Sequence, residues 1–227
     1  MKTFNEKFQA IMDSATALNP NLIDNWYFGN PVDQRGGYVT TFDTPAHTDE
    51  ALSNYIGPAY GTFTVTKIND SVGWYIASDT TWYVSLSDCV RGYTGAGYTI
   101  DRWKMIGDSA AVVLDSGFVT LHGNSSGAYW LQYIENKELY AGKMCTFSAL
   151  YGDNVFHTVS GVIAEGSELT LTGAPGGWDA VTLTNNDLHI QHTANAGNAK
   201  NIVAAKLELG TEQTLVHQEN GVWVLNE

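Results

Sequence analysis

Aromatic side chains are the residues of this sequence whose types and positions point most directly to chemistry. The chain of 227 residues contains seven Trp and twelve Tyr. A flat ring can stack on the C–H face of a sugar while nearby polar side chains hydrogen-bond the sugar hydroxyls. The candidate ligand-binding residues are Trp74, Tyr75, Trp82, Tyr83, Tyr93, Tyr98 and Trp178.

Four of these candidates form two adjacent pairs, Trp74-Tyr75 and Trp82-Tyr83, on neighbouring short β runs. Side chains alternate between the two faces of a strand, so one ring of each pair faces inward and its neighbour outward. A small meander cannot cover both sets of rings. The outward rings could bind a ligand, or they could pack in a core or between subunits, and both alternatives stay open.

The remaining candidates lie in loops. Trp178 is in the stretch GAPGGWDA, a Gly-Pro loop between two expected strands, and Tyr93 and Tyr98 flank the glycine-rich stretch YTGAGY. Loops on a β scaffold are where binding usually resides. Three further tryptophans within expected strands are predicted to be core residues: Trp26, Trp103 and Trp130.

Signals for catalysis and for metal binding are weak. The acidic residues are scattered, with no spacing that singles out the carboxylate pair of a glycosidase, and no Gly-x-Ser-x-Gly motif occurs. His189 and His192 are three positions apart, which on a strand puts them on opposite faces. We therefore expect no enzyme activity and no cofactor. A structural Ca²⁺ stays open, with Asp24, Asp101 and Asp153 as conceivable ligands.

Net charge narrows the class of partner. The formal net charge is -13 at pH 7, which argues against nucleic acid and anionic membranes, because both are bound by clustered Lys and Arg. No stretch approaches the ~20 apolar residues of a membrane span, and no signal-peptide core occurs. We expect a chain made in the cytoplasm without a secretion signal. Cys89 and Cys145 are too few for a disulfide framework, and two free buried thiols are favoured over a bridge.

One helix and many short strands are expected to position these residues. Residues 3–18 carry apolar side chains at helical spacing, and Asn19-Pro20 ends that pattern. After it, short β runs alternate with Gly, Asn and Asp turns, which is typical of an all-β sandwich or barrel. The expected strands span residues 21–28, 60–68, 73–78, 81–87, 99–107, 110–115, 118–123, 128–135, 142–152, 156–164, 167–173, 180–185, 187–193, 200–210 and 221–227.

Four stretches carry a family resemblance: NLIDNWYFGNPVDQRG, RGYTGAGYTIDRWK, ELYAGKMCTFSALYG and NIVAAKLELGTEQT. Together they resemble a β-jelly-roll domain of phage and prophage tail-fibre-like proteins, and more distantly the carbohydrate-binding modules of the galactose-binding-like superfamily. They span about residues 20–36 and 90–215. The family pattern matches this chain at Gly142, Lys143, Thr146, Ser148, Lys206, Leu207, Glu208 and Gly210.

The resemblance implies a jelly-roll β-sandwich over residues 20–215, with residues 37–90 as an inserted β section. Residues 1–19 would form a neck or packing helix, and residues 216–227 a last strand or the start of a further region. We expect a non-catalytic module that binds glycans on a bacterial surface. It would be part of a homotrimeric tail fibre or appendage of a virion, with other virion proteins as further partners. One alternative is a purely structural virion decoration or assembly domain. Another is a surface-polysaccharide hydrolase or lyase.

Overall fold

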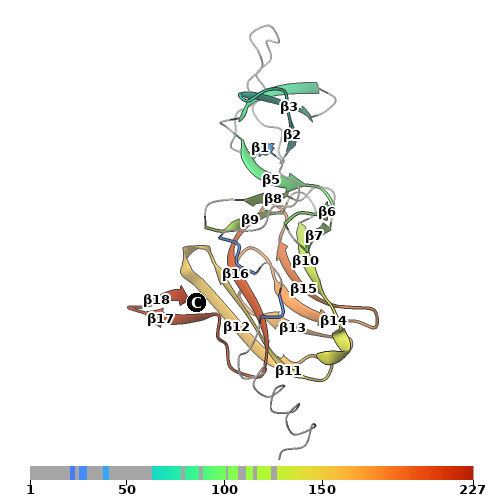
Figure 1. Cartoon of the computed structure of the whole chain (residues 1–227), viewed down its shortest axis with the longest axis vertical. Coiled ribbons are helices and arrows are strands. Elements are labelled where there is room, and N and C mark those ends of the chain that lie inside the picture. The colour runs from blue at the N-terminus through green and yellow to red at the C-terminus, as the bar shows by residue number, and fades with distance from the viewer. Residues whose placement is uncertain are drawn as a thin grey trace, which may run out of the picture.

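The protein is an all-β structure of two large antiparallel sheets and one hairpin (Figure 1). A computed structural model describes residues 21–23, 26–29, 38–40, 63–77, 80–86, 89–100, 102–106, 111–114, 117–123 and 127–226. The predicted helix at residues 3–18 lies outside these residues. Among the residues described, no helix is long and apolar enough to cross a membrane.

The first sheet has ten strands in the order β12-β11-β16-β9-β8-β5-β1-β2-β3-β4. In chain order they are β1 (Tyr38–Thr40), β2 (Phe63–Lys67), β3 (Val72–Ala77), β4 (Thr80–Ser85), β5 (Val90–Thr94), β8 (Ala111–Leu114), β9 (Val119–His122), β11 (Met144–Tyr151), β12 (Val155–Val162) and β16 (Ala199–Leu209).

The second sheet has six strands in the order β13-β14-β15-β10-β7-β6. They are β6 (Gly97–Tyr98), β7 (Trp103–Ile106), β10 (Ala128–Ile134), β13 (Ser167–Leu171), β14 (Asp179–Leu183) and β15 (Leu188–Ala194). The hairpin of β17 (Val216–Glu219) and β18 (Val222–Leu225) projects to one side of the sandwich in Figure 1. Two short 3₁₀ turns, η3 (Lys137–Leu139) and η4 (Gly152–Asn154), connect strands.

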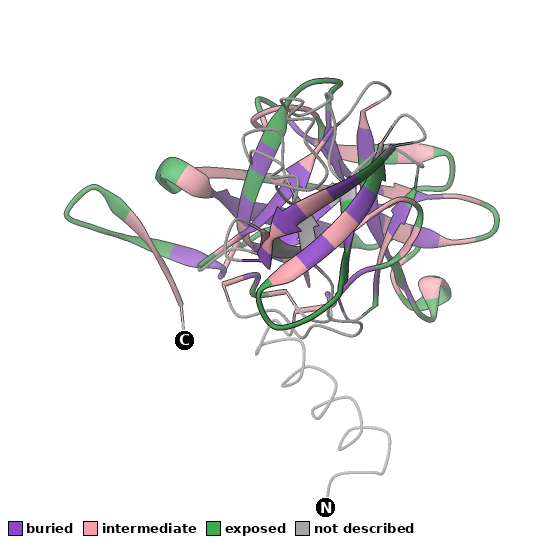
Figure 2. Cartoon of the chain, turned by 90° about the horizontal axis from the view of Figure 1, so that it is seen from above, coloured by how far each residue is buried: buried purple, intermediate pink, exposed green. Residues whose placement is uncertain are grey.

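The core lies between the two sheets, where the inward side chains of both meet. Figure 2 shows the buried stretches of the strands in purple. On β10, Trp130 and Ile134 face inward, whereas Tyr129 and Tyr133 face outward, as the period of two requires. The rings of Trp103 and Trp130 stack at 4.3 Å between centroids, and both side chains are fully buried. The prediction that these two tryptophans are core residues is confirmed, and Trp26 is half-buried against the same cluster.

The all-β class and the sandwich are therefore confirmed. Between β9 and β16 the chain passes from one sheet to the other at four connections: β9–β10, β10–β11, β12–β13 and β15–β16. The jelly-roll form of the sandwich stays a prediction.

The described part of residues 37–90 has a small core of its own. Strands β2, β3 and β4 form a meander at the upper end of Figure 1, and its buried side chains are Val65, Tyr75, Trp82, Val84 and Leu86. Tyr75 lies directly opposite Trp82, and Trp74 opposite Tyr83, so each adjacent pair splits between the two faces as predicted. The meander joins the sandwich through β1, which pairs with both β2 and β5.

The prediction of a continuous strand at residues 21–28 is wrong for its described residues. They form one isolated bridge, Tyr27 to Ala204, and irregular hydrogen bonds along β16, such as Leu22 N to Leu207 O at 2.9 Å. At the start of the segment, Asn21 Oδ1 accepts from the backbone N–H groups of Ile23 (3.0 Å) and Leu207 (3.2 Å). There a side-chain amide takes the place of a ladder hydrogen bond.

A second correction concerns residues 99–107, which were expected to form one strand with Asp101 and Arg102 on opposite faces. Arg102 instead has φ 63, in the left-handed region, and β7 begins only at Trp103. A tight turn closes this segment, with Trp103 N donating to Ile100 O at 3.1 Å. Asp101 lies outside the described residues. The turn directs Arg102 away from the ladder, and this determines the site described below.

Candidate ligand-binding surface

The outward face of the six-stranded sheet carries a group of exposed aromatic rings. Tyr129 and Tyr133 project from β10, and Tyr98 from β6 at the edge of the sheet. Trp178 precedes β14 and is exposed as well. We call these four side chains the aromatic face. Successive outward residues on one strand are about 7 Å apart, so Tyr129 and Tyr133 lie roughly 13 Å apart along β10.

Cross-strand pairing places Tyr129 and Trp178 near each other. Tyr129 pairs with Thr193 of β15 on one side and with Ile106 of β7 on the other. The backbone N–H of Trp178 donates to the Thr193 hydroxyl at 2.8 Å, and that hydroxyl donates to the Trp178 carbonyl. Thr193 therefore holds the loop that carries Trp178 against β15, at the position directly opposite Tyr129.

A polar pocket lies at one end of the aromatic face, beside Tyr133. Its volume is about 330 Å³, near the lower end of the range of ligand pockets. It is lined by Leu22, Arg102, Tyr133, Ile134, Glu135, Asn136 and Tyr140. Tyr133 thus belongs both to the aromatic face and to the pocket wall.

Two turns build this pocket. Arg102 (φ 63) immediately precedes β7, and Asn136 (φ 55) follows β10. The chain therefore turns sharply just before β7 begins and again just after β10 ends. Because Trp103 pairs with Gln132, Arg102 comes next to Tyr133 at the end of the β7–β10 ladder. The Arg102 guanidinium Nη2 and the Glu135 carboxylate Oε1 are 2.6 Å apart, which joins the two turns.

The pocket offers the groups that a sugar ring needs. Arg102 is a hydrogen-bond donor, the Glu135 carboxylate is an acceptor, and the Asn136 amide is both. Tyr133 and Tyr140 line the pocket too, but the surface that it exposes is almost wholly polar. The ring surface available for stacking is the exposed part of Tyr133 on the aromatic face, at the edge of the pocket. Such a site can hold a polyhydroxylated ring by stacking and by several hydrogen bonds.

The structure separates the seven sequence-predicted candidates. Trp178 and Tyr98 are exposed and belong to the aromatic face. Trp74 and Tyr83 are half-buried and opposite each other on the meander. Tyr75 and Trp82 are only 4% and 5% exposed, so their rings fill the meander core and offer no face to a ligand. Tyr93, on β5, is half-buried against the main core.

Sequence reasoning missed the centre of this surface: Tyr129, Tyr133, Arg102, Glu135 and Asn136. One signal was present in the segment AYWLQYIE. Side chains alternate between the two faces of a strand, so a Trp130 that faces the core requires Tyr129 and Tyr133 to face outward. No local signal pointed to Arg102 and Glu135, since they are 33 residues apart and meet only through the β7–β10 pairing.

A second polar cluster lies inside the sandwich around Asp179. His192 Nδ1 is 2.7 Å from Asp179 Oδ2, and the Tyr151 hydroxyl donates to the same oxygen. Asp179 Oδ1 accepts from Lys200 Nζ at 2.5 Å and from the Thr193 backbone N–H at 3.0 Å. Among the described residues, Nε2 of His192 has no hydrogen-bond partner. We call this the Asp179 cluster.

Burial and charge act in opposite directions on the Asp179 cluster. Burial acts to raise the pKa of Asp179, but the interactions with His192 and Lys200 outweigh it and hold that pKa far below its ordinary value. Burial, followed by the nearby Asp179 charge, raises the pKa of Tyr151. The side chains of Asp179, His192 and Lys200 have no exposed surface, so no ligand in solvent reaches them. The cluster therefore holds the two sheets together.

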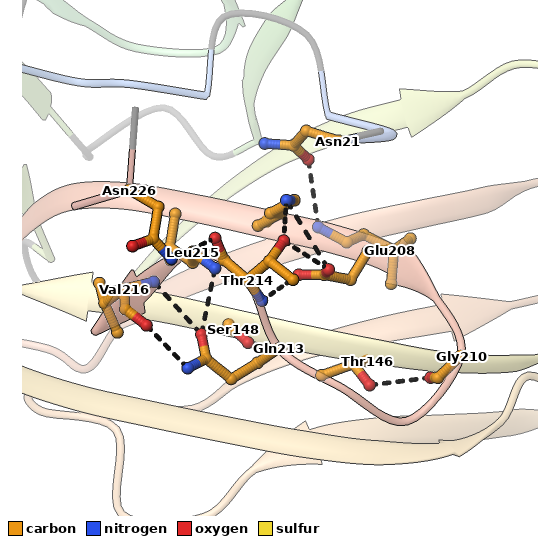
Figure 3. Close-up of polar contacts among 12 residues, drawn as sticks. Asn21, Thr146, Ser148, Glu208, Gly210, Gln213, Thr214, Leu215, Val216 and Asn226 are labelled. Atoms are coloured by element: carbon orange, nitrogen blue, oxygen red, sulfur yellow. Dashed lines mark hydrogen bonds and ion pairs between the residues drawn. The ribbon is translucent and has the colours of Figure 1, made fainter. Parts of the chain in front are cut away.

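The residues that carry the family resemblance form a polar clamp beside β16 (Figure 3). Buried Glu208 accepts from the backbone N–H (3.0 Å) and the hydroxyl (2.8 Å) of Thr214. The Thr146 hydroxyl donates to the Gly210 carbonyl at 2.9 Å, and the Asn21 amide donates to a β16 carbonyl at 3.0 Å. These contacts attach three parts of the chain to β16 and the residue after it: the segment at Asn21, the strand β11 through Thr146, and the segment at Thr214.

Metal-binding and cysteine chemistry receive little support. Among the described residues, no group of three or more His, Cys, Asp or Glu side chains could hold a metal ion. Of the conceivable Ca²⁺ ligands, Asp24 and Asp101 lie outside the described residues, and Asp153 is exposed on a turn. His189 and His192 face opposite sides of β15, as predicted. Cys89 and Cys145 are not joined by a disulfide; Cys145 is buried as expected, whereas Cys89 is half-buried. Burial raises the pKa of Cys145 to about 11.

Comparisons with protein-family models, with curated protein sequences and with solved structures find no match for this chain. Its function must therefore be inferred from the site itself.

Proposed function

We propose that this chain is a non-catalytic carbohydrate-binding module whose site is the aromatic face together with the adjoining pocket. The observation that carries the proposal is the position of Tyr133. Its exposed ring stands between further exposed rings and a pocket with donor and acceptor side chains. Aromatic surface beside planar polar groups suits a sugar better than it suits an apolar ligand.

The carboxylates of the pocket favour binding over hydrolysis. Glycosidases use two carboxyl groups about 5–10 Å apart on either side of the scissile bond. Among the described residues that line the pocket, Glu135 is the one acidic side chain, and it is engaged with Arg102. The buried Asp179 cannot be its partner, because its side chain has no exposed surface.

We further propose that the module belongs to a phage or prophage tail fibre or appendage and binds glycans on a bacterial surface. The support for this part is the resemblance of four sequence stretches. A shallow site of this kind binds each sugar weakly, and several copies in a homotrimer would raise the overall avidity. In that setting residues 3–18 would lie at or near the trimer axis.

A purely structural role in a virion has one specific observation in its favour. Four outward residues of the meander are apolar or aromatic, among exposed threonines: Ile76 and Ile68 are exposed, and Trp74 and Tyr83 are half-buried nearby on adjoining strands. An apolar surface on a small β section is typical of a contact with another protein. This surface is separate from the aromatic face, so the two roles predict different sensitive residues.

A glycan array with the purified chain tests the proposal, and Tyr27 supplies a matched control. Tyr133 and Tyr27 are each 42% exposed, but Tyr27 is bridged to β16 in the other sheet. We expect binding to a defined glycan class that Tyr133→Ala reduces at least tenfold and Tyr27→Ala leaves within twofold. Tyr133→Phe, which keeps the ring, should retain most of the binding. Absence of binding by the folded chain, or equal losses in both alanine variants, would contradict the proposal.

A further inference from the structure

We infer that the pocket selects an uncharged sugar ring and discriminates against uronic acids and other anionic sugars. This inference rests on the proposed function and concerns the same site. It follows from the way in which the cationic side chains around the pocket are already engaged.

The first observation is that the cations near the pocket have partners. Arg102 pairs with Glu135 at 2.6 Å, and His189 pairs with Asp187 at 2.7 Å. Lys137 Nζ donates to the backbone carbonyls of Thr184 (3.2 Å) and Asn185 (2.5 Å). Lys104 lies on the outward side of β7, opposite Tyr98 and Leu131, and it does not line the pocket. A sugar carboxylate in the pocket would therefore meet Arg102 alone among the cations of the described lining residues, and Glu135 already offsets that charge.

The second observation is the Glu135 carboxylate itself. Arg102 is the one cation among the described lining residues, and Glu135 stands directly beside it. A ligand carboxylate that approached Arg102 would come close to the Glu135 carboxylate, and two like charges at such a distance repel each other. The net charge of -13 adds to this repulsion over longer distances.

A neutral sugar does not meet this obstacle. Each hydroxyl can both donate and accept, so neighbouring hydroxyls can accept from Arg102 and donate to Glu135 without separating the ion pair. A carboxylate can only accept. The volume of about 330 Å³ suits one ring, and the polar lining suits its hydroxyls.

Matched pairs of methyl glycosides test the inference by saturation-transfer NMR on the intact chain. Methyl glucoside is compared with methyl glucuronoside, and methyl galactoside with methyl galacturonoside, so that each pair differs only in the oxidation of C6. We expect at least one neutral glycoside to bind, and its uronic acid to bind at least tenfold more weakly. If no sugar of either kind binds, the proposed function fails. If a uronic acid binds as well as its neutral partner or better, the proposed function stands and this inference is overturned.

Two variants test the cause of the discrimination. Glu135→Gln removes the negative charge but keeps a hydrogen-bonding side chain of the same shape, and we expect the neutral-to-acidic affinity ratio to fall at least fivefold. Glu138→Gln is the matched control, because Glu138 is an exposed neighbour on η3 that does not line the pocket, and it should keep the wild-type ratio. An unchanged ratio in Glu135→Gln would overturn the charge argument. Both substitutions are on the surface, and an unchanged Tm confirms that each variant is folded.

Discussion

The Asp179 cluster and the Arg102–Glu135 pair show how one β-sandwich uses similar ion pairs for different purposes. Lys200 and Asp179 are 2.5 Å apart with no exposed surface, whereas Arg102 and Glu135 are 2.6 Å apart with side chains 39% and 71% exposed. The distances are nearly equal, so distance does not distinguish them. Burial does, because it decides whether a charge is fixed by the protein or available to a ligand.

Energetics separate the two regions as well. Removal of one partner from a buried ion pair leaves an uncompensated charge and costs about 3–5 kcal/mol, whereas an exposed pair contributes roughly 0–1 kcal/mol. The Asp179 cluster should therefore dominate stability, and the exposed pair should dominate binding. The following predictions test that distinction.

The largest effect is expected for Asp179→Ala. The substitution leaves the buried Lys200 ammonium and the Tyr151 hydroxyl without their shared acceptor. We expect the free energy of unfolding to fall by about 3–5 kcal/mol, measured by urea denaturation at pH 7. A loss below about 1 kcal/mol would show that the cluster does not hold the sheets together. If the variant does not fold, Lys200→Met at the same pair allows the measurement with an apolar replacement.

A smaller effect is expected when pH is lowered. The pKa of Asp179 is far below the value of about 3.9 for an unfolded aspartate, so this group stabilises the fold above about pH 4. That contribution is lost progressively as pH falls through the lower folded-state pKa. We expect the free energy of unfolding of the wild-type chain to fall between pH 6 and pH 3. In Asp179→Asn the fall should be shallower, and equal slopes for the two chains would assign the effect to other carboxylates.

The smallest effect on stability is expected for Glu135→Gln. Because its partner Arg102 is also exposed to solvent, loss of the pair should change the free energy of unfolding by at most about 1 kcal/mol. Urea denaturation at pH 7 measures it alongside Asp179→Ala. A loss as large as that of Asp179→Ala would mean that the pocket is part of the framework, and the distinction between the two regions would fail.

Much of the fold could be predicted because its signals are local. Alternation of side-chain types along residues 128–135 predicted β10, and the expected burial of Trp130 predicted which side of the strand faces inward. From β8 to β16 each strand begins within two residues of the predicted start. The errors at Arg102 and at residues 21–28 arise where one residue departs from the pattern, through a left-handed φ or a side-chain amide that replaces a ladder.

The two polar clusters could not be predicted because they depend on contacts between distant residues. Asp179 meets residues 13, 21 and 28 positions away along the chain. In the sequence, Trp178-Asp179 lies at the end of a glycine-rich loop. That position predicted an exposed Trp178, which the structure confirms, but it did not predict a buried aspartate. Arg102 and Glu135 likewise come together only through strand pairing.

The most direct test of the central claim is to map the bound sugar on the chain by amide NMR. The probe is the neutral methyl glycoside that binds most strongly among those tested. We predict that the largest chemical-shift changes cluster at residues 129–136, at Arg102 and at Trp178. Changes confined to the meander of β2, β3 and β4, with none at Tyr133, would contradict the claim and move the ligand-binding role to the inserted section.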